Sequence, residues 1–306
     1  MAATPARRRP PSTPTMIDRV SAIRRRIRRL IYRARRWRRQ AVSPDLRRCL
    51  VVLRAGDQSL HPAWLDARDQ PRRLWDLHLS YFGPSDDPFP DRPADVTLSR
   101  EPGPKLIGLA DCFDNPSTRF PRPLESYDWI WLPDDDMLMY QHNIDSFVRL
   151  VAAYDLDLAQ PALHERSYIG HPITGRHGGS LLRFTNFVEV MCPCFSKWAF
   201  DLCRPHFRDT VSSWGVDFLF PKLLGFPKRS IAIVDATTAV HTRKHGGPNL
   251  DWARNAGLDP AVELKELLAR HGLAFEMHNL AVVKPDGHIT EDLSGIEPLI
   301  AGDRSP

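Results

Sequence analysis

The chain has 306 residues, of which 42% are hydrophobic, 9% aromatic and 26% charged. This composition excludes an intrinsically disordered chain and is typical of a globular protein of enzyme size, with one or two domains. No run of apolar residues reaches the length of about 18 that a membrane-spanning helix needs, so we expect no such helix.

The net charge of +5 conceals an uneven distribution. The first 48 residues contain 16 arginines against Asp18 and Asp45, which gives this segment a charge of +14 and leaves the remainder at −9. A basic tail on an acidic body argues against nucleic acid filling the main cleft. We therefore do not expect nucleic acid as a partner of the body.

The cysteines are odd in number and no secretory signal precedes them, so free thiols in a reducing compartment are the simplest account. Cys192 and Cys194 are separated by one residue, which matches neither a zinc site nor a thioredoxin-type pair. We expect a cytoplasmic protein whose cysteines are ordinary buried residues. They are Cys49, Cys112, Cys192, Cys194 and Cys203.

Residues 1–15 are rich in Pro, Arg, Ser and Thr, which predicts a disordered tail. In residues 16–42, apolar side chains recur at steps of three and four and the opposite face is almost entirely arginine, which predicts a basic amphipathic helix. The apolar positions are Ile17, Val20, Ile23, Ile27, Leu30, Ile31, Ala34 and Trp37.

A helix with an apolar stripe and a cationic back suits an anionic membrane surface. Residues 16–40 therefore predict peripheral association with the inner membrane. Three alternatives stay open: the stripe packs on the body or on a second subunit, the arginines bind RNA or DNA phosphates, or the segment is a mitochondrial-type transit peptide.

The folded body is predicted to begin near Leu46 and to form one domain, residues 46–306, with a C-terminal helical segment. Apolar runs that favour strands alternate with segments of helical spacing, which indicates an α/β sheet. The strands are expected at 49–53, 74–81, 127–132, 156–160 and 231–240, and the helices at 105–112, 144–153 and 259–271. Asp259 is the expected N-cap of the last helix, with Pro260 in its first turn.

The most informative segment reads YDWIWLPDDDM, from Tyr127 to Met137. An aromatic, apolar run fits a buried strand, and its end would place Asp134, Asp135 and Asp136 at the edge where ligands bind in open α/β sheets. Three adjacent carboxylates repel one another, and Mg2+ or Mn2+ is the natural compensating cation. The plainer alternative is a turn or helix cap formed by the aspartates.

Several motifs occur in an order that resembles a known family. A strand ending in Arg54-Ala-Gly-Asp57 is followed by Lys105, by the three aspartates, by Trp214-Gly-Val-Asp217 and by a strand ending at His241. This order, over roughly residues 49–271, resembles the DUF707 family of uncharacterised proteins. The pattern of that family is in turn similar to GT-A-fold nucleotide-sugar glycosyltransferases.

The resemblance implies a GT-A-like mixed central sheet flanked by helices. It also implies transfer of a sugar from a nucleotide-sugar donor to a hydroxyl acceptor, for instance a surface glycan or glycolipid precursor. Asp134 and Asp136 match the ends of an Asp-x-Asp motif that holds the metal ion, and Asp136 is the preferred direct ligand. His241 completes the metal site, with His245 as the alternative.

The resemblance assigns further roles. The donor's nucleotide is expected against the end of the first strand, at Arg54, Ala55, Gly56 and Asp57. Lys105 is expected to contact a phosphate or the base, and Asp134 or Asp135 to face the ribose or sugar. Asp217 is the candidate general base of an inverting transfer, which is slightly favoured. In a retaining enzyme it would position the acceptor, and its plain alternative is a helix-capping role.

Two readings compete with a glycosyltransferase. The same carboxylates suit a metal-dependent phosphate-ester or glycosidic hydrolase that uses water as the acceptor. A non-catalytic adaptor would bind membranes or nucleic acid through residues 16–40 alone. The basic pair Arg243 and Lys244, after His241, is a departure from the family pattern.

Overall fold

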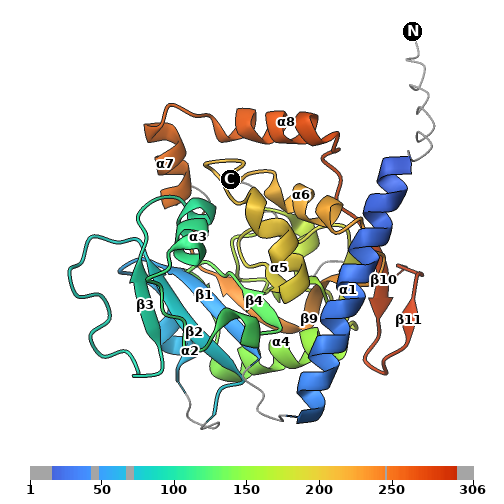
Figure 1. The fold of residues 1–306 in the computed structure, drawn as a ribbon, viewed down its shortest axis with the longest axis horizontal. Coiled ribbons are helices and arrows are strands. Elements are labelled where there is room, and N and C mark those ends of the chain that lie inside the picture. Colours follow the sequence, from blue (N-terminus) through green and yellow to red (C-terminus); the bar gives the residue numbers. More distant parts are fainter. Residues whose placement is uncertain (1–15, 43–47, 67–71, 245–246, 295–306) are drawn as a thin grey trace. The chain divides into compact units, whose positions relative to one another are not determined.

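The computed structural model describes residues 16–42, 48–66, 72–244 and 247–294 (Figure 1). The predicted tail at 1–15, Leu46 and His245 lie outside these residues. Contacts divide the chain into two units, Met1–Val42 and Ser43–Pro306, which we describe separately.

The first unit contains one helix, α1 (Met16–Val42), as the apolar periodicity predicts. Its sequence has neither Gly nor Pro, the two residues that most weaken a helix interior. Among its described side chains, Ile23, Ile27, Leu30 and Ile31 are all more than 40% exposed and share one face. None of the described helices is both long enough and apolar enough to cross a bilayer.

The second unit is built on a mixed sheet whose strand order is β3-β2-β1-β4-β8-β6-β9-β7-β10-β11. Its strands are β1 (Cys49–Ala55), β2 (Trp75–Tyr81), β3 (Thr97–Arg100), β4 (Trp129–Trp131), β6 (Leu158–Leu163), β7 (Leu182–Thr185), β8 (Cys194–Ser196), β9 (Ile231–His241), β10 (Asn279–Val283) and β11 (Ile289–Thr290). A short strand, β5 (Met137–Leu138), pairs only with the end of β9.

Strand direction decides where the strand ends gather. β1 is parallel to β2 and β4, β2 is parallel to β3, and β6 is parallel to β9. Because β8 is antiparallel to both β4 and β6, those two strands also share one direction. The carboxyl ends of β1, β2, β3, β4, β6 and β9 therefore meet at one edge of the sheet.

Helices cover both faces of the sheet (Figure 1). α2 (His61–Trp64) and α4 (Gln141–Ala153) pack on one face through a cluster of buried apolar residues. α3 (Lys105–Asp114), α5 (Lys197–Cys203) and α6 (Val216–Leu223) lie on the other and share contacting phenylalanine rings. The remaining helices are α7 (Pro248–Asn255), α8 (Pro260–His271) and the short 3-10 turns Leu124–Ser126, Pro172–Thr174 and Arg204–His206.

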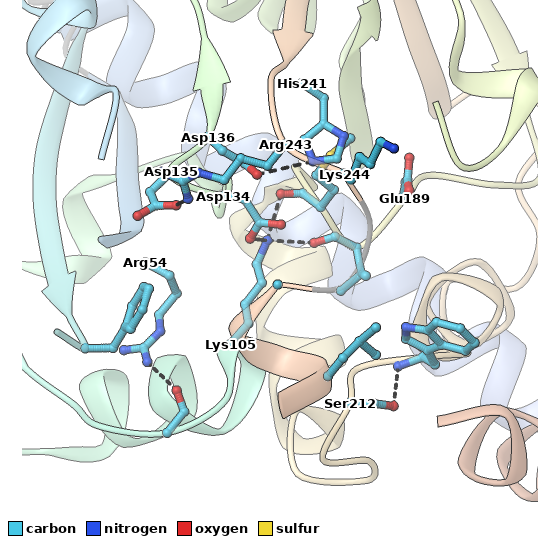
Figure 2. Close-up of a pocket in the computed structure, with 17 residues that line it drawn as sticks. Arg54, Lys105, Asp134, Asp135, Asp136, Glu189, Ser212, His241, Arg243 and Lys244 are labelled. Carbon is cyan, nitrogen blue, oxygen red and sulfur yellow. Dashed lines mark hydrogen bonds and ion pairs between the residues drawn. The ribbon is translucent and has the colours of Figure 1, made fainter. Parts of the chain in front are cut away.

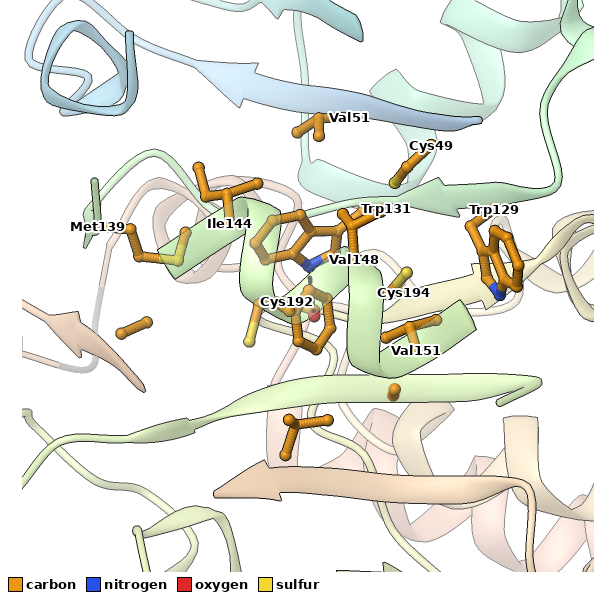
Figure 3. Close-up of a cluster of buried hydrophobic side chains, with 14 of the residues drawn as sticks. Cys49, Val51, Trp129, Trp131, Met139, Ile144, Val148, Val151, Cys192 and Cys194 are labelled. Atoms are coloured by element: carbon orange, nitrogen blue, oxygen red, sulfur yellow. Dashed lines mark hydrogen bonds between the residues drawn. The ribbon is translucent and has the colours of Figure 1, made fainter. Parts of the chain in front are cut away.

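Alternation along the buried strands assigns side chains to these two faces. Cys49 and Val51 of β1 join the cluster with α4, which Figure 3 shows around Trp131. The Trp131 ring lies between Trp64 and Phe147, and its indole N–H donates to the Cys192 carbonyl at 2.9 Å. The five cysteines are free and buried, as expected.

The predicted strands and helices are present, with shifts at their ends. β6 continues through Pro161 to Leu163, where the sequence predicted an end at Gln160. Its pairing with β9 shifts register after Pro161, the kind of irregularity at which a strand tolerates proline. Asp259 caps α8 as expected, since its carboxylate accepts the Ala261 N–H at 2.8 Å.

A fully buried ion pair fastens β7 to β9. Arg183 donates to both carboxylate oxygens of Asp235, at 2.9 and 3.0 Å, and both side chains are 0% exposed. Asp235 also accepts from the Ser180 hydroxyl and the His177 N–H, and Arg183 also donates to the Gly175 carbonyl. The bidentate geometry and the extra hydrogen bonds offset the cost of burying two charges.

We expect Asp235→Asn to lower the free energy of unfolding by about 3–5 kcal/mol, because the neutral amide leaves the Arg183 charge buried without a counter-charge. Equilibrium urea denaturation measures this loss. Asp251→Asn is the matched control, since Asp251 pairs with Arg254 at 3.5 Å on the surface and should matter little. Equal, small losses in both variants would contradict the expectation.

Candidate functional site

A cavity of about 200 Å³ opens at the edge where the parallel strands end (Figure 2). Residues from several strands, helices and loops at this edge line the cavity. Glu189, Val190 and Met191 belong to the segment before β8. The other lining residues used below are Arg54, Phe82, Gly103, Lys105, Asp134, Asp135, Asp136, Trp214, His241, Arg243 and Lys244. The position predicted for the aspartates is thus the position of the cavity.

The pairing of β5 with β9 brings His241 to Asp136. β5 follows the aspartates directly, and Met137 lies opposite His241 in the antiparallel pair. The Asp136 carbonyl accepts the Thr242 N–H at 3.1 Å, and His241 Nε2 lies 3.3 Å from Asp136 Oδ2. His241 Nδ1 donates to the Tyr168 carbonyl at 2.7 Å, which points Nε2 towards the carboxylate.

The charges of this pair reinforce each other. Burial is the largest single effect and acts to lower the pKa of His241. The hydrogen bond and charge of Asp136, the Tyr168 carbonyl and the charge of Asp134 together outweigh burial and raise that pKa to about 9. The second carboxylate oxygen, Asp136 Oδ1, is buried and accepts no hydrogen bond. When a divalent cation displaces the proton on Nε2, the unpaired buried oxygen and this imidazole nitrogen are a pair of atoms suited to bind it.

Asp134 does not join that pair, because Lys105 engages it. Lys105 Nζ lies 2.6 Å from Asp134 Oδ1 and also donates to the carbonyls of Val190 and Met191, at 2.8 and 2.7 Å. Burial raises the pKa of Asp134 to about 6, against the lowering effect of Lys105. In the described part of the chain, no three His, Cys, Asp or Glu side chains converge on one point that could hold a metal ion.

Lys105 therefore has a different environment from the one the resemblance implies. It is only 3% exposed, and the three protons of its ammonium group face three protein oxygens. It clamps the segment after β4 to the segment before β8, and it also lines the cavity.

Asp135 is held from two sides. Its carboxylate accepts the Gly56 N–H at 2.7 Å and an Arg243 N–H at 2.8 Å, and burial raises its pKa. Arg243 also donates to the Gln58 carbonyl at 2.7 Å and so ties the loop after β9 to the loop after β1. A Cβ at Gly56 would lie 2.9 Å from the Phe82 ring, so the glycine allows this close packing.

Arg54 forms a buried charge under the cavity. It is 3% exposed and donates to the Ser80 hydroxyl, the Glu101 carbonyl and the Gly103 carbonyl at 2.7–2.9 Å. Burial lowers its pKa to about 10. Two other residues predicted to bind the donor have different environments. Ala55 is buried, whereas Asp57 is exposed and accepts a hydrogen bond from the Tyr81 hydroxyl.

Asp217 does not line the cavity. It lies in the first turn of α6 after Gly215, whose φ of +89° starts the helix, and it is 5% exposed. Burial raises its pKa to about 7, against the lowering effect of backbone N–H groups that include Phe218 and Val190. The carboxyl group therefore contacts its own helix and the segment that carries Glu189.

Three charged residues of the cavity were given no site role from the sequence: Glu189, Arg243 and Lys244. Glu189 is 6% exposed, and burial raises its pKa to about 8, with a further contribution from the charge of Asp217. Lys244 is exposed at the mouth. The signals were present, since Glu189 interrupts an apolar run at 187–195 and Lys244 belongs to the basic pair after His241.

Residues 117–183 match the family described as "Protein of unknown function (DUF707)". The match confirms the predicted resemblance over a segment that contains the three aspartates, while Asp217 and His241 lie outside it. No curated protein matches the chain.

Solved structures are similar at low identity. S. aureus TarS 1–349 in complex with UDP-GlcNAc shares 12% identity and covers 73% of this chain and 72% of its own, at a TM-score of 0.43. GalNAc-T7 with UDP, GalNAc and Mn2+ shares 8% identity and covers 73% of this chain and 51% of its own, at 0.44. The mixed sheet flanked by helices agrees with the predicted fold class. Similarity at this level does not identify a substrate.

We expect Gly108→Ala in α3 to lower the free energy of unfolding by about 1–3 kcal/mol, because the added Cβ would lie 2.6 Å from the Arg54 guanidinium carbon. That guanidinium is fixed by buried hydrogen bonds and cannot move cheaply. In an open helix the same change stabilises by up to about 1 kcal/mol. Thermal and urea unfolding measure the sign, and Gly247→Ala, which meets open space, is the control.

Proposed function

We propose that the protein is a metal-dependent glycosyltransferase that moves a sugar from a nucleotide-sugar donor to a hydroxyl acceptor. The observation that carries this proposal is the lining of the cavity. Asp136 and His241 offer ligands for a hard cation, while Lys244 and Arg243 lie at the same mouth. A diphosphate that carries a metal ion would match both the cation ligands and the basic side chains. The motif order that resembles GT-A enzymes supports the same function.

The residues present fit Mn2+ or Mg2+ in a particular way. Asp136 Oδ1 has no hydrogen-bond partner, and His241 Nε2 faces the same carboxylate. Mg2+ in phosphate-processing sites commonly takes one or two protein carboxylates and completes its shell with substrate phosphates and water. Asp136 and His241 would hold the ion, and Asp134, the third ligand proposed from the sequence, pairs with Lys105. When bound, the ion neutralises the charge that develops on the departing diphosphate.

The other charged residues prepare the cavity. Arg243 fixes Asp135 and the loop after β1, and Arg54 adds positive potential from beneath. Lys244 is the residue we expect to meet a phosphate, in place of Lys105. Asp217, the candidate from the sequence for the general base or for acceptor positioning in a retaining enzyme, is not among the residues that line the cavity.

We expect Asp136→Asn to weaken Mn2+-dependent binding of UDP or GDP by at least about tenfold, because loss of a ligand or its support typically costs 10–100-fold in metal affinity. Calorimetric titration of each nucleotide, with Mn2+ and then with EDTA, measures the effect. Asp111→Asn, an exposed carboxylate of α3 outside the cavity, is the control. Nucleotide binding that is indifferent to both EDTA and the substitution would remove the metal from the proposal.

Product analysis separates transfer from the hydrolase alternative. A transferase releases free sugar from its donor slowly and turns over faster when a hydroxyl acceptor is added. Fast release of free sugar that no acceptor accelerates would favour the hydrolase.

We also infer that α1 attaches the protein to an anionic membrane surface on the cytoplasmic side. Its exposed isoleucines and leucine share one face, and arginines occupy much of the remainder. An apolar face provides insertion into the interface, and each basic residue adds about 1 kcal/mol near anionic lipid. These features favour lipid over a nucleic acid, which has no use for the apolar face.

We expect the double substitution Ile27→Glu and Leu30→Glu in the full chain to weaken binding to vesicles with anionic phosphatidylglycerol by more than about tenfold, because each apolar side chain contributes about 1.5–3 kcal/mol on burial. Vesicle sedimentation measures binding, and neutral phosphatidylcholine vesicles test the role of charge. Val262→Glu on α8, an exposed apolar position of the body, is the control. Undiminished vesicle binding by the double variant would contradict attachment through α1.

A further inference from the structure

Glu189 is a buried carboxylate that the protein leaves unsatisfied. It lines the cavity beside Val190 and Met191 and is only 6% exposed. Its oxygen Oε2 is buried and accepts no hydrogen bond. A buried carboxylate oxygen without a hydrogen-bond partner lowers the stability of the fold. Glu189 therefore calls for a functional explanation rather than a structural one.

The backbone around Glu189 is fixed even though its carboxylate is not. The Glu189 N–H donates to the Gln160 side-chain carbonyl at 2.6 Å, and the Glu189 carbonyl accepts the Cys192 N–H at 3.3 Å. Lys105 holds the next two carbonyls. Figure 2 draws the Glu189 carboxylate on the opposite side of the view from Arg54.

The groups around Glu189 set its proton affinity. Burial and the negative charges of Asp217 and Asp134 raise its pKa, while His241 and Lys105 lower it, and the result is a pKa of about 8. A carboxyl group whose pKa lies near neutral pH exchanges a proton readily under physiological conditions.

Asp217 lies close to the segment of Glu189 but does not line the cavity. Both carboxyl groups have one oxygen without a hydrogen-bond partner, but of the two only Glu189 lines the cavity. Asp217 accepts the N–H of Val190, the residue next to Glu189. Asp217 therefore connects α6 to the segment that presents Glu189.

We propose that Glu189 is the general base that removes the proton of the acceptor hydroxyl, and that Asp217 is a positioning residue for it; this rests on the proposed glycosyl transfer. As the acceptor oxygen forms its bond to the anomeric carbon, its proton passes to the Glu189 carboxylate. The bond from that carbon to the phosphate oxygen breaks, and the electron pair leaves with the nucleoside diphosphate. The proton on Glu189 returns to water after product release.

The test uses the full chain with Mn2+ and four donors: UDP-glucose, UDP-galactose, UDP-N-acetylglucosamine and GDP-mannose. Released UDP or GDP is measured with water as acceptor and then with azide, an anionic nucleophile that has no proton to lose. Glu189→Gln should reduce kcat by about 10²–10⁴, the usual contribution of a general base, while UDP affinity changes less than about twofold. Unaltered UDP binding also shows that the variant is folded.

Azide distinguishes a base from a structural residue. We expect azide to restore nucleotide release in Glu189→Ala, with formation of the glycosyl azide, and to have no such effect in Asp217→Asn. The wild-type kcat should rise with pH through about 8, as Glu189 loses its proton, and Glu189→Gln should lack this rise. Rescue of Asp217→Asn instead would return the base to Asp217 and overturn the inference.

The two proposals fail in different ways. If the wild type releases nucleotide and Glu189→Gln is as fast, the inference is wrong and the glycosyltransferase proposal stands. If the wild type releases nucleotide from none of the four donors, the proposed function fails for them and the assignment of Glu189 falls with it.

Discussion

The constraint on which this site depends is the repulsion among three consecutive carboxylates at the end of a buried strand. Two distant segments compensate the three aspartates. Lys105, which opens α3, pairs with Asp134, while His241 at the end of β9 and Arg243 just after it pair with Asp136 and Asp135. Because the cations come from α3 and from the end of β9, compensating the charges also fixes these two segments around one cavity.

β9 makes this arrangement possible because it serves two sets of partners. Its first half lies in the central sheet between β6 and β7, and its end pairs with β5. The shift in register beside Pro161 accompanies this change of partners. The strand that anchors the sheet through Asp235 therefore also delivers His241, so core stability and site geometry are linked along one segment.

The sequence was sufficient for features that are local. The aromatic run from Trp129 to Trp131 predicted a buried strand. Because the aspartates follow that run, the sequence also predicted that they lie at the edge of the sheet where the cavity opens. Contacts between residues that are far apart in the chain could not be predicted from the sequence. The sequence predicted a phosphate contact for Lys105, but it did not predict the contacts of Lys105 with Asp134 and with two carbonyls 85 and 86 residues away. Glu189 interrupts an apolar run, but only the fold shows that this position lines the cavity.

Some of the buried polar atoms that lack a hydrogen-bond partner belong to residues that line the cavity. Asp136 Oδ1 and Glu189 Oε2 are both buried and unpaired, and both residues line the same cavity. A fold that satisfied them internally would be more stable, but it would fill the positions that a cation and a hydroxyl proton need. The surrounding residues are instead held firmly, Lys105 by three oxygens and Arg243 by two segments. In the proposed transfer, the unsatisfied atoms are thereby kept in place for the cation that accompanies the donor and for the proton of the acceptor hydroxyl.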